Sequence, residues 1–276
     1  MSLNSRARTT GLWILRVGVA VVCLLPFYWL ANVSLSTPSA VYKIPVDYFP
    51  DPAVTDNFRS VFETRQFPQN IWNSFVVASL TTLLTLGLGA PAAYALARLR
   101  VRHKEFVMAV FLGIAIFPAI GMVGPLYVAM ARLGLINSYP ALVLPYTLTS
   151  LPLAVWILTH YFGTLPGSLE DAALVDGCSP GEAFLRIILP VSTPGLFTAA
   201  ALIFIFAWNE FLFALILTTT PESRTVPVAL ALFAGLHELP WATIAAATII
   251  SVLPVLALVA LFQQRIVEGL TSGVER

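Results

Sequence analysis

Apolar residues gather in six long runs along this sequence, separated by shorter polar segments. Each run reaches the ~20 residues that a helix needs to cross the hydrocarbon core of a bilayer. The pattern therefore predicts an all-α integral membrane protein in which one domain, residues 1–276, contains six transmembrane helices. The predicted spans are residues 12–33, 71–97, 106–130, 141–162, 196–217 and 241–262.

The first run follows Arg6 and Arg8, as the apolar part of a signal peptide does. Its length of about 22 residues exceeds the ~7–15-residue apolar region of such peptides. No small-residue cleavage site follows it. We therefore predict that this run is retained as the first span.

The longest polar interruption in the second half of the chain is residues 163–195, called here loop 163–195. Ser168 is positioned to cap one short helix. Ser179, Pro180 and Glu182 have the spacing of a capping box with proline at the first helical position, which predicts a second helix. A segment that only joined two spans would not need capped helices.

Both predicted helices of loop 163–195 have a residue suited to end them. Gly177 lies where the first helix must stop and turn, and Pro190 lies where the second must end. Two short helices joined at a glycine predict a docking platform for a partner outside the membrane. On the first helix, four residues at positions i, i+3, i+4 and i+7 are predicted to share the docking face: Leu169, Ala172, Ala173 and Asp176.

Composition supports the membrane assignment, since 58% of the residues are hydrophobic and only 11% are charged. A soluble domain of this length has a much lower apolar fraction. The formal net charge of +1 gives no field that would attract nucleic acid. Cys23 lies in the first run and Cys178 in loop 163–195, so no disulfide between them is expected.

Lys and Arg residues predict the orientation. With six spans both termini lie on one side, and that side carries ten of the 15 basic residues, including the cluster from Arg98 to Lys104. The positive-inside rule then places both termini and loop 163–195 in the cytoplasm of a multi-pass protein of the cell membrane.

Two segments are predicted outside the cytoplasm by the same count. Residues 34–70 contain a stretch, 56–65, with apolar residues at helical spacing. This stretch either lies on the membrane surface or packs on the ends of other helices. Residues 218–240 are long enough to reach a partner on that side.

Several predicted spans contain helix breakers, such as Pro118 and Pro125 in the third. A broken helix is tolerated in a membrane where neighbours or water satisfy the freed backbone groups. Breaks of this kind suit helices that rearrange around a pathway. They are also simply commoner in membrane helices than in soluble ones.

Glu210 is the one acidic residue predicted within the core of a span, with Asn209 beside it. A carboxylate there costs roughly 2.5 kcal/mol or more unless it is paired or hydrated. Three interpretations stay open: the two side chains face a pathway or gate, they hydrogen-bond neighbouring helices, or Glu210 relays protons.

Residues that would indicate an enzyme are not arranged for catalysis. His103, His160 and His237 lack metal-ligand spacing. Lys43 and Lys104 are not part of a Gly-Lys-Ser/Thr phosphate-binding loop. We therefore expect a non-enzymatic chain without a metal or cofactor of its own, so that any ATP is hydrolysed by another chain.

Loop 163–195 resembles the EAA loop of ABC importer permeases. The family pattern is Glu-Ala-Ala, three residues, Gly, nine residues, Ile, one residue and Leu-Pro. The matching residues are Asp171-Ala172-Ala173, Gly177, Ile187 and Leu189-Pro190. Asp171 departs from the usual Glu but keeps the charge.

Four further segments are similar to the carbohydrate branch of that family, the maltose/trehalose-type permeases. They are Asp176-Gly177, Tyr94-Ala95-Leu96-Ala97-Arg98, Trp208-Asn209-Glu210-Phe211 and the tail from Gln264 to Gly273. The resemblance covers nearly the whole chain. It implies the type I importer permease fold with a cytoplasmic coupling helix in loop 163–195.

The resemblance also implies a function and partners. The chain would translocate a sugar, in particular a di- or oligosaccharide, by alternating access. Its partners would be a second homologous permease, two ATPase subunits that bind ATP and Mg²⁺, an extracytoplasmic substrate-binding protein and membrane lipid. Glycerol-phosphate-type or other small polar solutes are the alternative substrates, and a secondary transporter is the alternative class.

Residue roles carried over from the family fall into three groups. The residues expected to contact the ATPase are Leu169, Glu170, Asp171, Ala172, Ala173, Asp176, Gly177, Ile187, Leu189 and Pro190. Trp208, Asn209 and Glu210 are candidates for the pathway or gate. The tail residues Gly269, Leu270, Thr271, Ser272 and Gly273 are expected to reach the ATPase interface in some members of the family.

Overall fold

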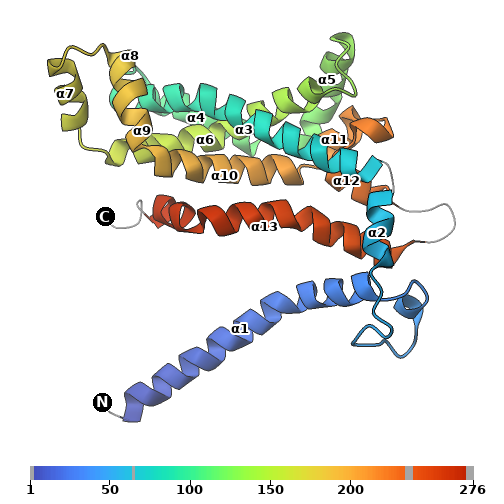
Figure 1. Ribbon diagram of the computed structural model, residues 1–276. Helices are drawn as coiled ribbons and strands as arrows, with labels where there is room; N and C mark the ends of the chain where they lie inside the picture. The colour runs from blue at the N-terminus through green and yellow to red at the C-terminus, as the bar shows by residue number, and fades with distance from the viewer. Residues whose placement is uncertain (1–2, 64–65, 234–238, 272–276) are drawn as a thin grey trace. The chain divides into compact units, whose positions relative to one another are not determined.

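The structure is a computed structural model that describes the backbone of residues 3–63, 66–233 and 239–271, and the side chains of residues 11–63, 66–233 and 239–262. Within these residues the chain is helical and forms no strand (Figure 1). The α-helices are α1 (Leu3–Leu35), α2 (Asp56–Glu63), α3 (Gln66–Arg98), α4 (Lys104–Ile116), α5 (Ala119–Arg132), α6 (Tyr139–Thr164), α7 (Ser168–Val175), α8 (Pro180–Ala183), α9 (Leu189–Val191), α10 (Thr193–Asn209), α11 (Leu212–Leu217), α12 (Val226–Ala231) and α13 (Trp241–Thr271).

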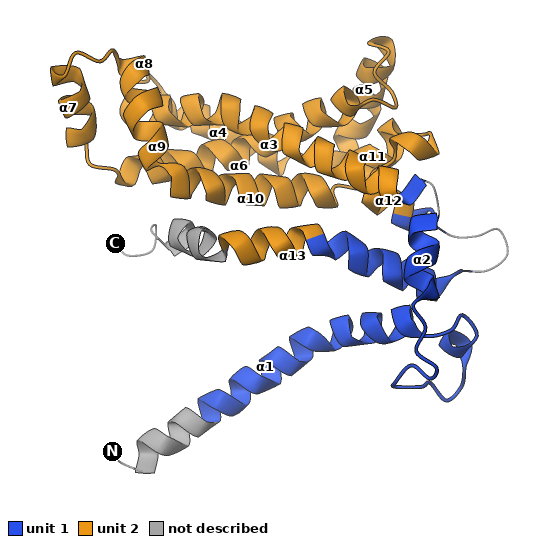
Figure 2. Ribbon diagram, in the orientation of Figure 1, with its two compact units in different colours: residues 1–67, 230–253 blue, residues 68–229, 254–276 orange. Residues whose placement is uncertain are grey.

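The chain divides into two compact units (Figure 2). Unit 1 contains residues 1–67 and 230–253, and unit 2 contains residues 68–229 and 254–276. Helix α13 begins in one unit and ends in the other. Loop 163–195 belongs entirely to unit 2, so its geometry is described within that unit.

Four helical segments are long and apolar enough to cross a bilayer by themselves: Gly11–Leu35, Gln66–Arg98, Tyr139–Thr164 and Trp241–Phe262. Two bent helix pairs meet the same criterion when each pair is treated as one span. The described part of the chain therefore holds four to six candidate spans, and six agrees with the number predicted.

The third predicted span, residues 106–130, is not one helix. It is the pair α4 and α5, which bend by 90° at Phe117 and Pro118. Phe117 is extended, with ψ 128°, because the ring of the following proline disfavours helical backbone in the residue before it. Pro118 then serves as the N-cap of α5.

The fifth predicted span, residues 196–217, is also interrupted. It consists of α10 and α11, separated at Glu210, whose ψ of 129° is extended. On the other side of α10, the helical path from Pro180 to Val191 meets it at an angle of 76° around Ser192. Loop 163–195 therefore enters α10 through a sharp bend.

In unit 1, helix α2 packs on the end of α1. The amide Nδ2 of Asn57 donates to the carbonyls of Ser34 (2.9 Å) and Ser36 (2.8 Å). Val61, one turn later on α2, is fully buried. Of the two interpretations for residues 56–65, these contacts favour packing on the ends of other helices.

The segment that follows α1 is closed by side chains. Asn32 donates to the carbonyls of Asp47 and Tyr48 at 3.1 and 2.8 Å. The Lys43 ammonium donates to the Asp47 carboxylate at 2.7 Å, and this contact raises the pKa of Lys43 above its usual value.

In unit 2, helices α3 and α6 run in the same direction and contact each other at three places. Near their starts, the Tyr139 hydroxyl donates to Oδ1 of Asn73 at 2.9 Å. At mid-length a Cβ at Gly89 would lie 3.3 Å from Ala154 Cβ, so the backbones approach closely there. Near their ends the rings of Tyr94 and Phe162 pack edge to face.

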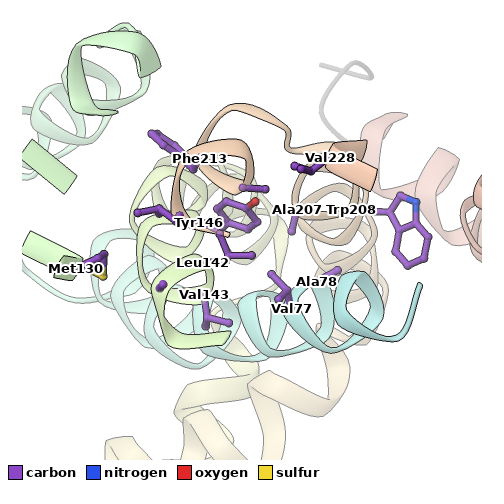
Figure 3. Packing of buried hydrophobic residues seen from close by; sticks show 13 residues of the cluster. Val77, Ala78, Met130, Leu142, Val143, Tyr146, Ala207, Trp208, Phe213 and Val228 are labelled. Carbon is purple, nitrogen blue, oxygen red and sulfur yellow. The ribbon is translucent and has the colours of Figure 1, made fainter. Parts of the chain in front are cut away.

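Two apolar clusters fill unit 2. The first surrounds Tyr146 and includes Leu142, Val77 and Phe213, contributed by α6, α3 and α11 (Figure 3). The second surrounds Phe162 and lies toward loop 163–195. The second cluster matters for the candidate site because α7, the π turn at Phe184–Ile188 and α9 contribute to it.

Gly195, in the first turn of α10, lies against the ring of Tyr161 on α6. A Cβ at Gly195 would lie far inside van der Waals contact with the ring carbons of Tyr161. Only a glycine lets α10 leave the bend at Ser192 this close to α6.

We predict that Gly195→Ala lowers the free energy of unfolding by about 1–3 kcal/mol, because the added methyl group overpacks the contact with Tyr161. The measurement is thermal melting of the purified protein in detergent. Gly87→Ala, at a helical glycine of α3 with open space around its Cα, is the matched control and should melt at or above the wild-type temperature. Equal melting of the two variants would contradict the close approach.

Candidate functional site

Loop 163–195 forms two helical segments that stand at one end of unit 2 (Figure 1). Helix α7 is the first segment. The second begins with α8, continues through a π turn at Phe184–Ile188 and ends with α9. The predicted pair of short helices is thus present.

The start of α7 differs from the prediction. Ser168 was predicted as the N-cap, but it is the first residue of the helix, and Gly167 is the N-cap without a side-chain cap. Gly167 has helical backbone angles, and its carbonyl accepts from the amides of Glu170 (3.0 Å) and Asp171 (3.2 Å). The prediction was wrong because the backbone at Gly167 already has helical geometry.

The end of α7 confirms the role predicted for Gly177. This residue has φ +86°, a left-handed conformation in which a side chain is strained. The Gly177 amide donates to the carbonyl of Leu174 (3.1 Å), and the Cys178 amide donates to that of Ala173 (2.9 Å). This pair of bonds is a Schellman motif, which satisfies the last carbonyls of the helix and reverses the chain.

The second segment begins with the predicted capping box. The Glu182 carboxylate accepts from the amide (3.0 Å) and hydroxyl (2.9 Å) of Ser179. In return, the Glu182 amide donates to the Ser179 hydroxyl at 3.4 Å. Pro180 occupies the first helical position, as predicted. Both segments therefore have fixed termini on the two sides of Gly177.

The second segment ends one residue after Pro190, at Val191. Pro190 has no N–H and cannot bond to the carbonyl of Arg186, as a regular helix would require. The helix widens just before it: the Leu189 amide reaches back five residues to the carbonyl of Phe184. This π turn accommodates Pro190 within the helix, which ends one residue later than predicted.

Helix α7 has an inner and an outer face. Leu169 and Ala173, four residues apart, face the rest of unit 2, and Ala173 is 1% exposed. The outer face consists of Asp171, Ala172, Leu174, Val175 and Asp176, all exposed. Ala172 and Ala173 were predicted to share one docking face, and that prediction was wrong. Consecutive helical residues point about 100° apart, and Ala173 is used by its own chain.

The outer face combines apolar and acidic groups. Val175 is 87% exposed and Leu174 49%, although both are apolar, while Asp171 and Asp176 carry negative charge. Apolar side chains held this far into solvent on a short, rigid helix are typical of an interaction surface.

The second segment packs on unit 2 through residues that the sequence analysis did not single out. The ring of Phe184 lies 4.7 Å from that of Tyr94 and 6.3 Å from that of Phe162. Ile188 is fully buried beside them. Among the motif residues, Ile187 and Leu189 are half-buried and Pro190 is exposed.

Glu210 caps a helix. Its carboxylate accepts from the amides of Phe213 (2.9 Å) and Ala214 (3.2 Å), which satisfies the first turn of α11 where the span is broken. Trp208 is buried and stacks on Phe204. Asn209 is exposed, and its Nδ2 donates to the carbonyl of Ile205 in its own helix. Of the three open interpretations, these contacts favour the structural one for Glu210.

At the far end of α3, asparagines hold the segment after α11. Asn70 and Asn73 both donate to the carbonyl of Arg224, at 2.9 and 3.0 Å. Oδ1 of Asn137 accepts from the amides of Thr219 (2.6 Å) and Thr220 (3.2 Å). The polar hollow beside them measures about 370 Å³. Its asparagines, Asn73 and Asn137, are already hydrogen-bonded within the protein.

Two further predictions concern the C-terminal tail and the histidines. Gly269, Leu270 and Thr271 continue the backbone of α13, and Ser272 and Gly273 lie outside the described residues. Across the described ranges, no group of three His, Cys, Asp or Glu side chains is arranged to hold a metal ion. His237 also lies outside the described residues.

The chain therefore combines membrane-length helices with a two-helix loop at one end of unit 2. Residues 85–270 match the family of binding-protein-dependent transport system inner membrane components, and the chain belongs to that family.

Individual relatives are similar over almost the full length. The trehalose/maltose transport system permease protein MalG of Thermococcus litoralis is 42% identical over 92% of this chain and 92% of its own. The trehalose transport system permease protein SugB of Mycobacterium tuberculosis is 41% identical over 97% and 98%. The sulfoquinovosyl glycerol transport system permease protein SmoH of Agrobacterium fabrum is 38% identical over 91% and 88%.

The fold also matches a solved structure. A chain in the crystal structure of a bacterial ABC transporter that imports the acidic polysaccharide alginate superposes with a TM-score of 0.83 at 21% identity, covering 96% of this chain and 98% of that one. At this identity the match shows the fold, which is the predicted ABC importer permease fold.

We predict that Gly177→Ala weakens the end of α7, because a methyl group at φ +86° costs about 1–2 kcal/mol in a left-handed conformation. Hydrogen–deuterium exchange of the α7 amides should become faster in the variant. Gly167→Ala is the matched control, since Gly167 has φ −63° and open space around its Cα. Unchanged exchange in Gly177→Ala would show that the Schellman motif does not hold the loop.

Proposed function

We propose that this chain is the permease subunit of a binding-protein-dependent ABC importer that carries a sugar, in particular a di- or oligosaccharide, into the cytoplasm. The outer face of α7 carries the proposal: it presents exposed Leu174 and Val175 between two carboxylates, on a loop whose termini are fixed. The sugar-importing relatives, at 38–42% identity, support the substrate class.

The partners follow from this proposal. A second, homologous permease completes the membrane part, and two ATPase subunits bind ATP and Mg²⁺ on the cytoplasmic side. The positive-inside count supports that orientation for both termini and loop 163–195. On the opposite side a sugar-loaded binding protein docks. The C-terminal residues 269–273 are a second candidate contact with the ATPases.

Alternating access links these parts. Closure of the ATPases around ATP displaces α7, and the helices of the permease rearrange from inward-facing to outward-facing. Coupling between two sites is reciprocal, so the docked binding protein must favour ATPase closure by the same free energy. A proton-coupled carrier is disfavoured, because the Glu210 carboxylate accepts hydrogen bonds from the first turn of α11.

We predict that Val175→Glu and Ala172→Glu each reduce ATPase co-purification about tenfold or more. Each substitution places a charge within the apolar contact that is proposed to hold the ATPase. Pull-down from detergent extracts measures this. Leu133→Glu is the control: Leu133 is 64% exposed and follows α5, at the other end of unit 2 (Figure 1). Full ATPase recovery with both α7 variants would sink the docking assignment.

We predict that purified complex in lipid vesicles, supplied with its binding protein and ATP, accumulates labelled maltose or trehalose. Glycerol phosphate, tested in parallel, should accumulate at the rate of vesicles without ATP. Uptake of glycerol phosphate but of neither sugar would overturn the substrate class while leaving the transport class intact.

A further inference from the structure

Helix α3 ends in direct contact with the start of α7. The guanidinium of Arg98, the last residue of α3, donates through Nη2 to the carbonyl of Leu165. Its Nε lies 3.4 Å from Oε1 of Glu170 in α7. Tyr94, one turn earlier on α3, also interacts with the Glu170 carboxylate. Two side chains at the end of α3 therefore meet one carbonyl and one carboxylate that lie about 70 residues later in the sequence.

This ion pair differs from the other three in the described part of the chain. Those pairs join residues four apart, and their side chains are 35–78% exposed. The side chains of Arg98 and Glu170 are 15% and 19% exposed. Solvent screens exposed pairs strongly and buried ones weakly, so the two charges of this pair interact with less screening than those of the surface pairs.

The pair is close but not hydrogen-bonded. Arg98 Nε and Glu170 Oε1 are both buried and 3.4 Å apart, and neither has a hydrogen-bond partner. A small shift of α7 that aligned the two groups would turn the contact into a charge-assisted hydrogen bond, and a displacement away would leave two buried charges unpaired. The energy of the contact therefore depends steeply on the position of α7.

Two consecutive acidic residues of α7 thus face in different directions. Asp171 is exposed on the outer face, available to a partner, whereas Glu170 is turned inward to Arg98. Arginine suits the inner position because its planar fork binds a carbonyl and a carboxylate at once, which the point charge of lysine does not.

We propose that Arg98 and Glu170 are a positioning pair that transmits displacement of α7 to α3, and so couples the ATPases to the transmembrane helices. This inference rests on the proposed function. It assigns the pair no contact with sugar or nucleotide. Its effect is on coupling between sites, and assembly of the complex does not depend on it.

The test uses the complete complex in lipid vesicles with its binding protein. Arg98→Gln and Glu170→Gln should each lower the stimulation of ATP hydrolysis by loaded binding protein about fivefold or more, the range expected when coupling free energy between sites is lost. Unstimulated hydrolysis and ATPase co-purification should stay near wild type. Arg186→Gln, which removes an exposed pair with Glu182 in the same loop, is the matched control and should keep full stimulation.

A double-mutant cycle separates pairing from general damage. Because the two residues act on each other, Arg98→Gln combined with Glu170→Gln should be no worse than either variant alone. Exchange of the charges, Arg98→Glu with Glu170→Arg, should recover part of the stimulation that either single reversal loses. Arg98→Lys should fall between Arg98→Gln and wild type.

The outcomes distinguish the two proposals. If the wild-type complex recruits no ATPase, the proposed function fails. If the wild type transports sugar and the Gln variants retain full stimulation, or if the double variant is additive, the positioning pair is wrong. Loss of ATPase binding in Glu170→Gln would also overturn it, since the pair would then serve docking.

Discussion

The structure of unit 2 depends on one constraint, that a backbone polar group in a bilayer finds its partner within the protein. The apolar stretch at residues 193–217 is broken, and the freed amides of Phe213 and Ala214 are satisfied by the Glu210 carboxylate. At the other end of α10, the helical path bends by 76° and Gly195 lets the backbone pass against Tyr161. An acid in a span is thus a consequence of the break, which explains why it sits without an ionic partner among the described contacts.

Loop 163–195 also has its backbone groups and apolar side chains satisfied within the protein, which gives it an inner and an outer face. Leu169, Ala173 and Ile188 hold the loop on unit 2, and the Schellman motif at Gly177 sets the angle between its two segments. Because the inner contacts are buried and the helix ends are bonded, Val175 stays in solvent without the loop collapsing onto it. A surface of this kind is preorganised, so a partner does not spend binding free energy on ordering it.

Sequence predicted the features that depend on neighbouring residues. The capping box at Ser179 and the helix end at Gly177 follow from local backbone chemistry. The candidate spans follow from the length of the apolar runs. The features that it missed depend on distant contacts. Whether Ala172 or Ala173 faces solvent is decided by where α7 packs. The 90° angle of the bend at Pro118 depends on how α4 and α5 pack on other helices. Arg98 was counted as a cytoplasmic charge and as part of the Tyr94–Arg98 motif, but its contact with Glu170 was missed because that partner lies 72 positions away in the chain.

Helix α3 joins the two ends of unit 2. At its start, Asn70 and Asn73 hold the carbonyls of residues 221–224, and at its end Arg98 holds Leu165 and faces Glu170. It is one helix of 33 residues, about 50 Å long at 1.5 Å per residue, and it contacts α6 at Asn73, Gly89 and Tyr94. A displacement of α7 therefore acts on α3 and α6. The opposite end of α3 is hydrogen-bonded to the segment after α11. Packed helices move as units because close-packed interiors transmit strain, so α3 gives the two ends of unit 2 a direct mechanical connection.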